Sequence, residues 1–168
     1  MSLKPMAGYA GAGESYSLRA AQAADQAPIK ALIRAVQINP LGIHWRRFVV
    51  AVDAAGTFIG CGQVKPHRDG SRELASIAVV RSWRKQGVAR AIIAHLQQAH
   101  PAPLWLTCMS PLVPFYAQFG FQEVYDVAQM PLYFRRVFRL FRLFTRGEQA
   151  ERYLAVMVWA GEAGTVDY

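Results

Sequence analysis

The sequence predicts a mixed α+β fold, in which one mixed, mostly antiparallel sheet is flanked by helices. Apolar runs of strand length alternate along the chain with segments of helical periodicity. Turn signals at residues 53–56 and 67–71 divide the first half into strand–turn–strand patterns, which favour antiparallel pairing. Residues 73–108 follow the order strand, loop, helix, strand, and this order predicts a parallel crossover.

Local patterns place the individual elements and give a sheet of about six or seven strands. A helix is expected over residues 23–36, where apolar side chains recur at helical spacing after Asp25. Further helices are expected at residues 88–96 and 112–119, the latter ending at Gly120. Strands are expected at residues 16–19, 48–52, 57–64, 73–80, 104–108, 121–127 and 153–159.

The composition indicates a folded chain with an anionic partner. Its 168 residues fit one domain, and we expect a flexible Gly/Ala/Ser-rich tail at residues 1–14 followed by a single domain at residues 15–168. A formal net charge of +8 favours a phosphate-rich cofactor, nucleic acid, an acidic protein or a membrane surface as partner.

Cysteine usage and hydropathy predict no metal site and a cytoplasmic location. Cys61 and Cys108 stand alone in apolar runs, without the spacing of metal ligands or of a disulfide framework, so both are expected to be buried thiols. The first residues lack the basic and apolar regions of a secretory signal, and no apolar run reaches membrane-spanning length.

A short basic loop joins the expected strand at residues 73–80 to the helix that follows. Backbone N–H groups at a helix N-terminus lack intrahelical acceptors, and the helix dipole is positive there. Gly87 allows a ligand to approach the backbone, and the small Ala89 keeps the first turn open. The loop is therefore either an anion cradle suited to a pyrophosphate or an ordinary turn with solvated basic side chains.

Three motifs in this order resemble the GNAT superfamily of acyl-CoA-dependent N-acyltransferases, over about residues 15–128 and 151–160. The loop Arg84-Lys85-Gln86-Gly87-Val88-Ala89 is similar to the family's Gln/Arg-x-x-Gly-x-Gly/Ala pyrophosphate loop. Ile77-Ala78-Val79 occupies the place of the family's splayed strand. The third motif, Phe115-Tyr116-Ala117-Gln118-Phe119-Gly120-Phe121, resembles its Tyr-x-x-x-Gly-Phe helix ending.

The resemblance implies an acetyl-CoA co-substrate and a V-shaped splay between the central parallel strands. Family loops often have Pro at the position of Arg81 and Gly at that of Lys85; only Pro lacks a backbone donor, so N–H donation tolerates both departures. The implied cofactor-binding residues are Ile77, Ala78, Val79, Arg84, Lys85, Gln86, Gly87, Val88, Ala89 and Arg90.

The resemblance also implies two catalytic residues. Glu73 matches the family's general base, and strand alternation places it on the same face as Ile77 and Val79. The alternative is a solvated glutamate paired weakly with Arg72 at the surface. Tyr116 matches the family's proton donor to the departing thiolate, and its alternative is a core tyrosine on an apolar helix.

Acceptor-binding residues are expected in the loop at residues 39–47, at Asn39, His44 and Trp45, where the family often places them. For every histidine, His67 included, a solvated or capping role is favoured over catalysis, because no triad or metal spacing surrounds it. The acceptor itself is an amine whose identity the sequence leaves open.

Residues 131–146 form an amphipathic basic-aromatic helical insert. Arg135, Arg139, Arg142 and Arg146 recur at helical spacing, opposite an aromatic side that contains Phe134 and others. This helix either packs on the domain, or borders the acceptor groove and favours an acidic or proteinaceous acceptor, or attaches weakly to a membrane surface. It could also serve a homodimer interface. Abundant Phe and absent Lys argue against nucleic acid.

The expected function is therefore acetyl-CoA-dependent N-acetyl transfer to a primary amine of a protein or small molecule, by direct attack in a ternary complex. The alternative is a non-catalytic acyl-CoA-sensing or membrane-docking module, in which the helix at residues 131–146 is the functional part.

Overall fold

The computed structural model describes residues 9–10, 15–144 and 152–161. These residues form a mixed α+β fold, as predicted, and divide into two compact units. The first unit comprises Met1–Lys65 and Leu74–Ala99, and the second comprises Pro66–Glu73 and His100–Tyr168. That residues 15–168 form a single domain stays a prediction.

In the first unit the strands follow the order β1-β2-β3-β4-β5. β1 pairs with β2, β2 with β3 and β3 with β4, each antiparallel, and the β3–β4 pairing is the one that the turn at residues 53–56 predicted. β1 lies within the segment expected to be a tail, whose other residues fall outside the described part. The bounds are β1 (Tyr9–Ala10), β2 (Ser15–Ala20), β3 (Phe48–Asp53), β4 (Phe58–Pro66) and β5 (Arg72–Val79).

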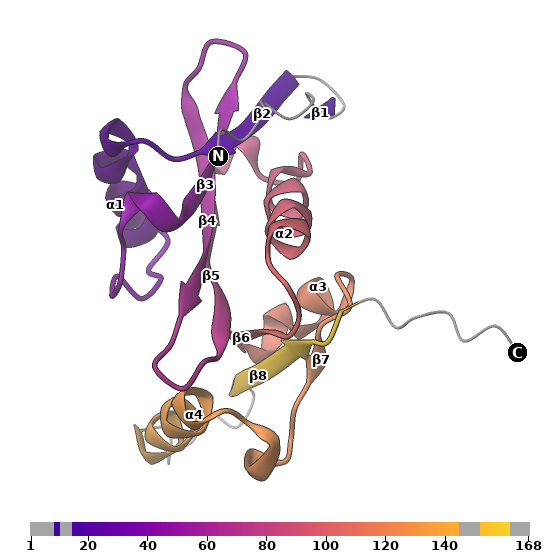
Figure 1. The fold of residues 1–168 in the computed structure, drawn as a ribbon. Coiled ribbons are helices and arrows are strands. Elements are labelled where there is room, and N and C mark those ends of the chain that lie inside the picture. Colours follow the sequence, from indigo (N-terminus) through magenta and orange to yellow (C-terminus); the bar gives the residue numbers. More distant parts are fainter. Residues whose placement is uncertain (1–8, 11–14, 145–151, 162–168) are drawn as a thin grey trace, which may run out of the picture. The chain divides into compact units, whose positions relative to one another are not determined.

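Two helices of the first unit, α1 (Gln26–Ala35) and α2 (Val88–Ala99), cover opposite faces of these strands (Figure 1). Cys61 packs in the apolar cluster that contains Ile29 and Ile33 of α1. The neighbouring Gly62 faces α2, since an added Cβ there would lie 2.6 Å from both Ile77 Cδ1 and Ile92 Cγ2. Single 3-10 turns of this unit lie at Ala23–Asp25, Trp45–Arg47 and Arg81–Trp83.

In the second unit β6 (Leu104–Met109) pairs antiparallel with β8 (Leu154–Trp159), which in turn pairs with β7 (Gln122–Glu123). Glu73 at the start of β5 pairs with Trp105 of β6 in parallel, as the predicted crossover requires. β7 is shorter than the strand expected at residues 121–127, because Asp126 caps the next 3-10 turn through a 2.9 Å bond from Ala128 N–H. The other elements are Ser110–Leu112, α3 (Val113–Ala117), Val127–Gln129 and α4 (Leu132–Phe144).

β5 departs from the regular alternation that the sequence suggested. Ser76 has φ of 59°, a left-handed conformation, and its buried hydroxyl accepts a 3.0 Å bond from Gln63 Nε2. The irregularity at Ser76 interrupts the strict period-2 alternation on which the expected common face of Glu73, Ile77 and Val79 was based, so that common face stays a prediction.

Helix α4 packs its aromatic side on the core of the second unit. Phe134 is fully buried and lies 5.6 Å, between ring centroids, from Trp105. The arginine stripe is only partly solvated: Arg135 turns inward, and its Nη2 donates to the carbonyls of Ala128 and Met130 at 3.0 and 3.1 Å. Residues 145–146 of the expected insert lie outside the described part. None of the helices described is both long enough and apolar enough to cross a bilayer.

Candidate active site

The basic loop of the first unit has the backbone geometry of an anion cradle. Gly87 has φ of 83° and Lys85 has φ of 63°, so both lie in the left-handed region that favours glycine. The Ala91 N–H donates to the Gly87 carbonyl at 2.9 Å, so the N–H groups of Val88 and Ala89 come before the first helical donor and have no intrahelical acceptor. Because the backbone at Lys85 is left-handed, a conformation that glycine adopts without strain, it is understandable that family loops often have glycine at this position.

Two side chains of the loop brace its backbone. Arg84 Nε donates to the Val79 carbonyl at 3.2 Å, and Gln86 Nε2 donates to the Ser82 carbonyl at 2.9 Å. Arg84 is thus partly engaged with the protein, while the side chains of Lys85 and Arg90 are exposed. The loop can therefore offer helix N–H groups and basic side chains to a phosphate.

The predicted cofactor strand lies against the helix that this loop begins. Val79 and Val88 side-chain atoms would both lie 3.4 Å from a Cβ at Gly60, and Ile77 approaches Ile92 across Gly62. Ala78 points the other way, into the cluster with α1. The first unit therefore brings Ile77, Ala78, Val79 and the loop together, as predicted, with only Ala78 turned to the opposite face.

Glu73 is buried in the second unit and has a specific partner. Only 8% of the residue is exposed, and its Oε2 lies 3.0 Å from His67 Nε2. Arg72 turns elsewhere, with its Nη2 donating to the Ala102 carbonyl at 3.3 Å. The surface-pair alternative for Glu73 is therefore wrong, and so is the expectation of a solvated or capping role for His67.

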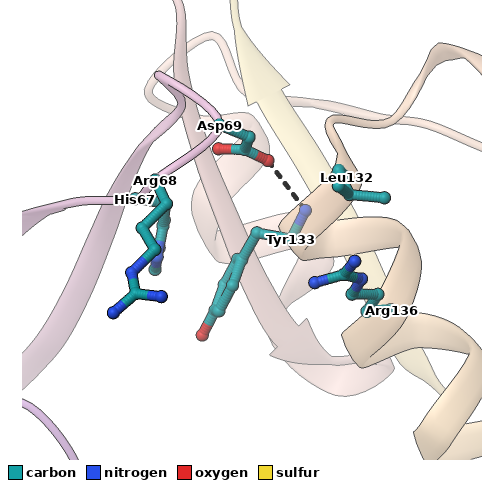
Figure 2. Close-up of a pocket in the computed structure, with 6 residues that line it drawn as sticks. All are labelled: His67, Arg68, Asp69, Leu132, Tyr133 and Arg136. Atoms are coloured by element: carbon teal, nitrogen blue, oxygen red, sulfur yellow. Dashed lines mark hydrogen bonds between the residues drawn. The ribbon is translucent and has the colours of Figure 1, made fainter.

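The insert helix holds His67 from the other side. The Tyr133 ring stacks on the His67 ring with 3.5 Å between centroids, and the edge of Phe134 meets it at 5.8 Å. The Tyr133 N–H donates to Asp69 Oδ2 at 2.7 Å, so Asp69 caps the start of α4 from the β4–β5 turn (Figure 2). Burial alone would raise the pKa of Asp69, but bonds from Ser71 and Tyr133 lower it to about 2. A carboxylate held in this way is charged at neutral pH.

A pocket of about 200 Å³ opens over these contacts. Two arginines extend beside the Tyr133 ring in it, Arg68 from the turn and Arg136 from α4 (Figure 2). Its lining residues are His67, Arg68, Asp69, Leu132, Tyr133 and Arg136. No short-range motif could have found this pocket, because its two walls are about 60 residues apart in the chain.

Tyr116 lies in an aromatic group on α3. Its ring meets Phe115 at 5.2 Å and Phe121 at 6.1 Å, both edge-on. Burial raises the pKa of Tyr116, and Cys108 of β6 raises it further, so the phenol stays protonated at neutral pH. In the part of the second unit that the structure describes, no hydrogen bond or ring contact links Tyr116 to Glu73. Both nevertheless lie near β6. Glu73 pairs with Trp105, and Tyr116 lies close enough to Cys108 for that thiol to affect its pKa. Trp105 and Cys108 are three positions apart, or about 10 Å along a strand.

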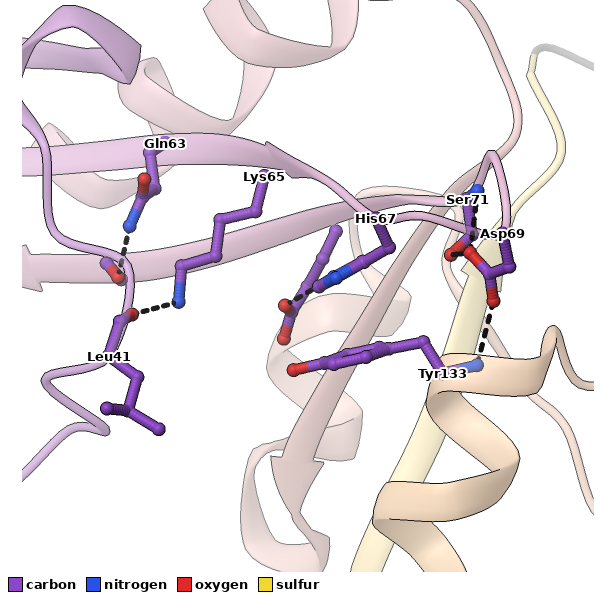
Figure 3. A network of polar contacts seen from close by, with 9 residues as sticks. Leu41, Gln63, Lys65, His67, Asp69, Ser71 and Tyr133 are labelled. Atoms are coloured by element: carbon purple, nitrogen blue, oxygen red, sulfur yellow. Dashed lines mark hydrogen bonds and ion pairs between the residues drawn. The ribbon is translucent and has the colours of Figure 1, made fainter.

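The expected acceptor loop lies in the first unit and is held at both ends. Lys65 Nζ donates to the Leu41 carbonyl at 2.9 Å (Figure 3), and Gln26 Oε1 accepts from the Trp45 N–H at 2.8 Å. His44 Nδ1 accepts from the Arg46 N–H at 3.3 Å, which is a capping role. Asn39 accepts from the Leu41 N–H and is exposed, so only Trp45 of the three predicted residues is half-buried.

The remaining predictions concern thiols and metals. Cys61 and Cys108 are buried, as expected, and burial raises the pKa of the Cys61 thiol to about 12 and that of Cys108 to about 11. Among the residues that the structure describes, no three His, Cys, Asp or Glu side chains gather as metal ligands do.

Comparison with known proteins places this geometry in a family. Residues 44–123 match the model of the acetyltransferase (GNAT) domain, a range that includes Glu73, the basic loop and Tyr116. No curated protein matches the chain.

Several solved structures have a similar fold. N-acetylglutamate synthase from Neisseria gonorrhoeae, complexed with coenzyme A and L-arginine, aligns with a TM-score of 0.68 and 20% identity over 88% of this chain and 33% of that one. Rv2747 from Mycobacterium tuberculosis, in complex with CoA and NLQ, gives 0.66 and 19% over 86% of this chain and 98% of that one. NAA60 from Arabidopsis thaliana, in complex with a bisubstrate analogue, gives 0.59 and 13% over 86% and 97%.

This chain thus spans about a third of the synthase and nearly all of the other two proteins. At these identities the alignments establish a shared fold, and the family model covers the segment that carries the predicted motifs. Residues 44–123 of the chain match the GNAT acetyltransferase domain, the family that the motifs resemble, and the fold is one that GNAT acetyltransferases share.

Proposed function

We propose that the protein is an acetyl-CoA-dependent N-acetyltransferase that acts on a primary amine by direct attack in a ternary complex. The observation that carries the proposal is the buried Glu73 carboxylate, held by His67 within the segment that matches the GNAT domain. The synthase and Rv2747 were solved with coenzyme A, which supports acetyl-CoA as the donor, with the loop at residues 84–90 as its pyrophosphate site.

In the proposed reaction the amine nitrogen attacks the thioester carbonyl carbon, a C–N bond forms and the C–S bond breaks. An amine with pKa near ~10 is mostly protonated at neutral pH, so a base must first take its proton. Glu73 takes that proton, directly or through water. The His67 ring fixes the carboxylate, which leaves one oxygen, Oε1, for the amine or water.

Tyr116 supplies the proton that the departing thiolate needs. Its raised pKa keeps the phenol protonated, which is the form that a general acid requires. The donated proton turns the coenzyme A thiolate into a thiol. The attacking nitrogen loses a second proton as the neutral amide forms, and this proton, passed through solvent, restores the Tyr116 phenol, while the proton that Glu73 holds returns to solvent.

The test compares two catalytic variants with two matched controls. We expect Glu73→Gln and Tyr116→Phe each to lower kcat by about 10²-fold or more, the usual effect of removing a general base or acid, while the Kd for acetyl-CoA changes little. Asp126→Asn and Tyr125→Phe remove a carboxylate and a phenol hydroxyl from exposed residues and should leave kcat unchanged. Unaltered kcat in both catalytic variants would overturn the roles of Glu73 and Tyr116.

A further inference from the structure

The pocket between the β4–β5 turn and α4 has a positive charge that the protein does not neutralise. It is lined by two arginines and one carboxylate, that of Asp69. In the part of the chain that the structure describes, Asp69 forms no ion pair with either arginine; its Oδ1 accepts from Ser71 and its Oδ2 accepts from the Tyr133 N–H. Within the described residues, neither Arg68 nor Arg136 has a hydrogen bond or an ion pair with any other group.

The arginines are placed on two rigid supports. Arg136 lies in α4, one turn after Tyr133, and Arg68 lies in the turn that Asp69 fastens to that helix. The 2.7 Å bond between Asp69 and the Tyr133 N–H therefore joins the two backbone segments that carry the arginines. It also occupies the helix N-terminus, so the positive charge available to a ligand is that of the side chains.

The pocket lies next to the proposed base. The His67 ring forms part of its lining, and Nε2 of the same ring contacts Glu73 Oε2 at 3.0 Å. The His67 side chain thus connects the lining of the pocket to the carboxylate that would deprotonate the amine. A molecule that presents an amine to Glu73 can place a second group beside the arginines only if the two groups are a few bonds apart.

We propose that this pocket binds the carboxylate of the amine acceptor, so that the acceptor is a small amino acid. This inference rests on the proposed function and names the substrate class of its site. Guanidinium groups match a carboxylate geometrically and donate charge-assisted hydrogen bonds to it. A volume of about 200 Å³ suits an amino-acid-sized group and is too small for a folded segment of protein.

The test uses pairs of amines that differ only in the carboxylate. Thiol release from acetyl-CoA is measured with L-alanine against L-alaninamide and with L-glutamate against L-glutamine. A neighbouring carboxylate makes the ammonium group harder to deprotonate, so the comparison is biased against the proposal. We expect the member with the additional carboxylate to have the higher kcat/KM in at least one pair.

Variants then connect this preference to the arginines. Arg136→Ala and Arg68→Ala should each raise KM for the preferred amino acid about ten- to hundredfold, the effect of losing one charged hydrogen-bond partner, and should change KM for L-alaninamide, which has no carboxylate, much less. Arg139→Ala is the control, because it removes an exposed arginine of the same helix that does not line the pocket. Both arginines of the pocket are exposed, so these variants should keep the melting temperature of the wild type.

The outcomes separate this inference from the proposed function. Acetylation of amides and amino acids with equal kcat/KM, or an Arg136→Ala variant that behaves like Arg139→Ala, would overturn the carboxylate pocket and leave the acetyltransferase intact. Faster turnover of 2-aminoethyl phosphate than of any amino acid would also overturn it, in favour of a phosphate. If no amine is acetylated, the proposed function fails. Binding of glutarate that Arg136→Ala abolishes would still support the pocket in that case.

Discussion

Replacing Phe134 with alanine removes the side chain that holds α4 on the second unit. Phe134 is fully buried and makes aromatic contacts with Trp105, His67 and Tyr133. The change tests whether the aromatic side of the insert helix serves packing, as the structure has it, or attachment to a membrane.

The expected loss of unfolding free energy is about 3–4 kcal/mol. A buried phenyl side chain removes ~150–250 Å² from water, which at ~25 cal/mol per Å² sets an upper value of about 4–6 kcal/mol. Measured Phe-to-Ala substitutions in cores cost about 3–5 kcal/mol. Alanine is the better helix former by roughly 0.5 kcal/mol, which offsets part of the loss.

Urea denaturation followed by Trp fluorescence measures this loss, because Trp105 lies against Phe134. With a slope of ~2 kcal/mol per M, the midpoint should fall by about 2 M. Phe134→Leu keeps most of the volume and should lose only about 1 kcal/mol, so it remains measurable if the alanine variant does not fold. Leu140→Ala alters an exposed apolar residue of the same helix and should change stability by less than ~0.5 kcal/mol. Equal midpoint shifts for Phe134→Ala and Leu140→Ala would refute the packing role.

Three further substitutions test the loop and the first unit. Gly87→Ala forces a Cβ into a left-handed conformation and should destabilise the protein by about 1 kcal/mol, measured by thermal melting, with weaker binding of acetyl-CoA in calorimetry. Lys85→Gly relieves the same strain, so a drop in stability of more than ~1 kcal/mol would show that the left-handed backbone is wrong. Asp25→Asn removes the bidentate ion pair with Arg19, whose hydrogen bonds lower the pKa of Asp25; because Arg19 is partly exposed, we expect a loss of about 1–2 kcal/mol at pH 7. The stability that the ion pair contributes is present above the unfolded pKa of ~3.9 and fades as the pH falls through the lower folded pKa. Denaturation curves of the wild type and the variant should therefore converge in acid. A constant difference in stability down to pH 2 would contradict this role of the ion pair.

The parts of the site that could be predicted are those that local sequence determines. A glycine in a basic loop between an apolar strand and an apolar helix predicts the geometry at Gly87, whatever the rest of the chain does. The order of strands and helices was predictable for the same reason, since hydrophobic periodicity reports each element separately. The conformation of Ser76 was not, because its backbone depends on a hydroxyl that accepts from Gln63 on the neighbouring strand.

His67 shows why the rest of the site could not be predicted. Nothing in its neighbourhood in the sequence distinguishes it from a solvated turn residue. Its role depends on Glu73, six residues later, and on Tyr133 of α4, whose N–H bonds to Asp69 across 64 residues of chain. Arg135 is a similar case: helical spacing assigned it to the solvated stripe, but the carbonyls of the preceding 3-10 turn draw it inward. Long-range contacts of this kind have no counterpart in local periodicity.

We propose above all that this domain transfers an acetyl group to an amine with Glu73 as the base. The most direct test incubates the wild type and Glu73→Gln with acetyl-CoA and a panel of amines, and compares the thiol released with the acetylated amine found by mass spectrometry. We predict one acetylated amine for each thiol released by the wild type, and a rate about 10²-fold lower for Glu73→Gln. Thiol release without acetylated amine, or an equal rate for the two proteins, would contradict the claim.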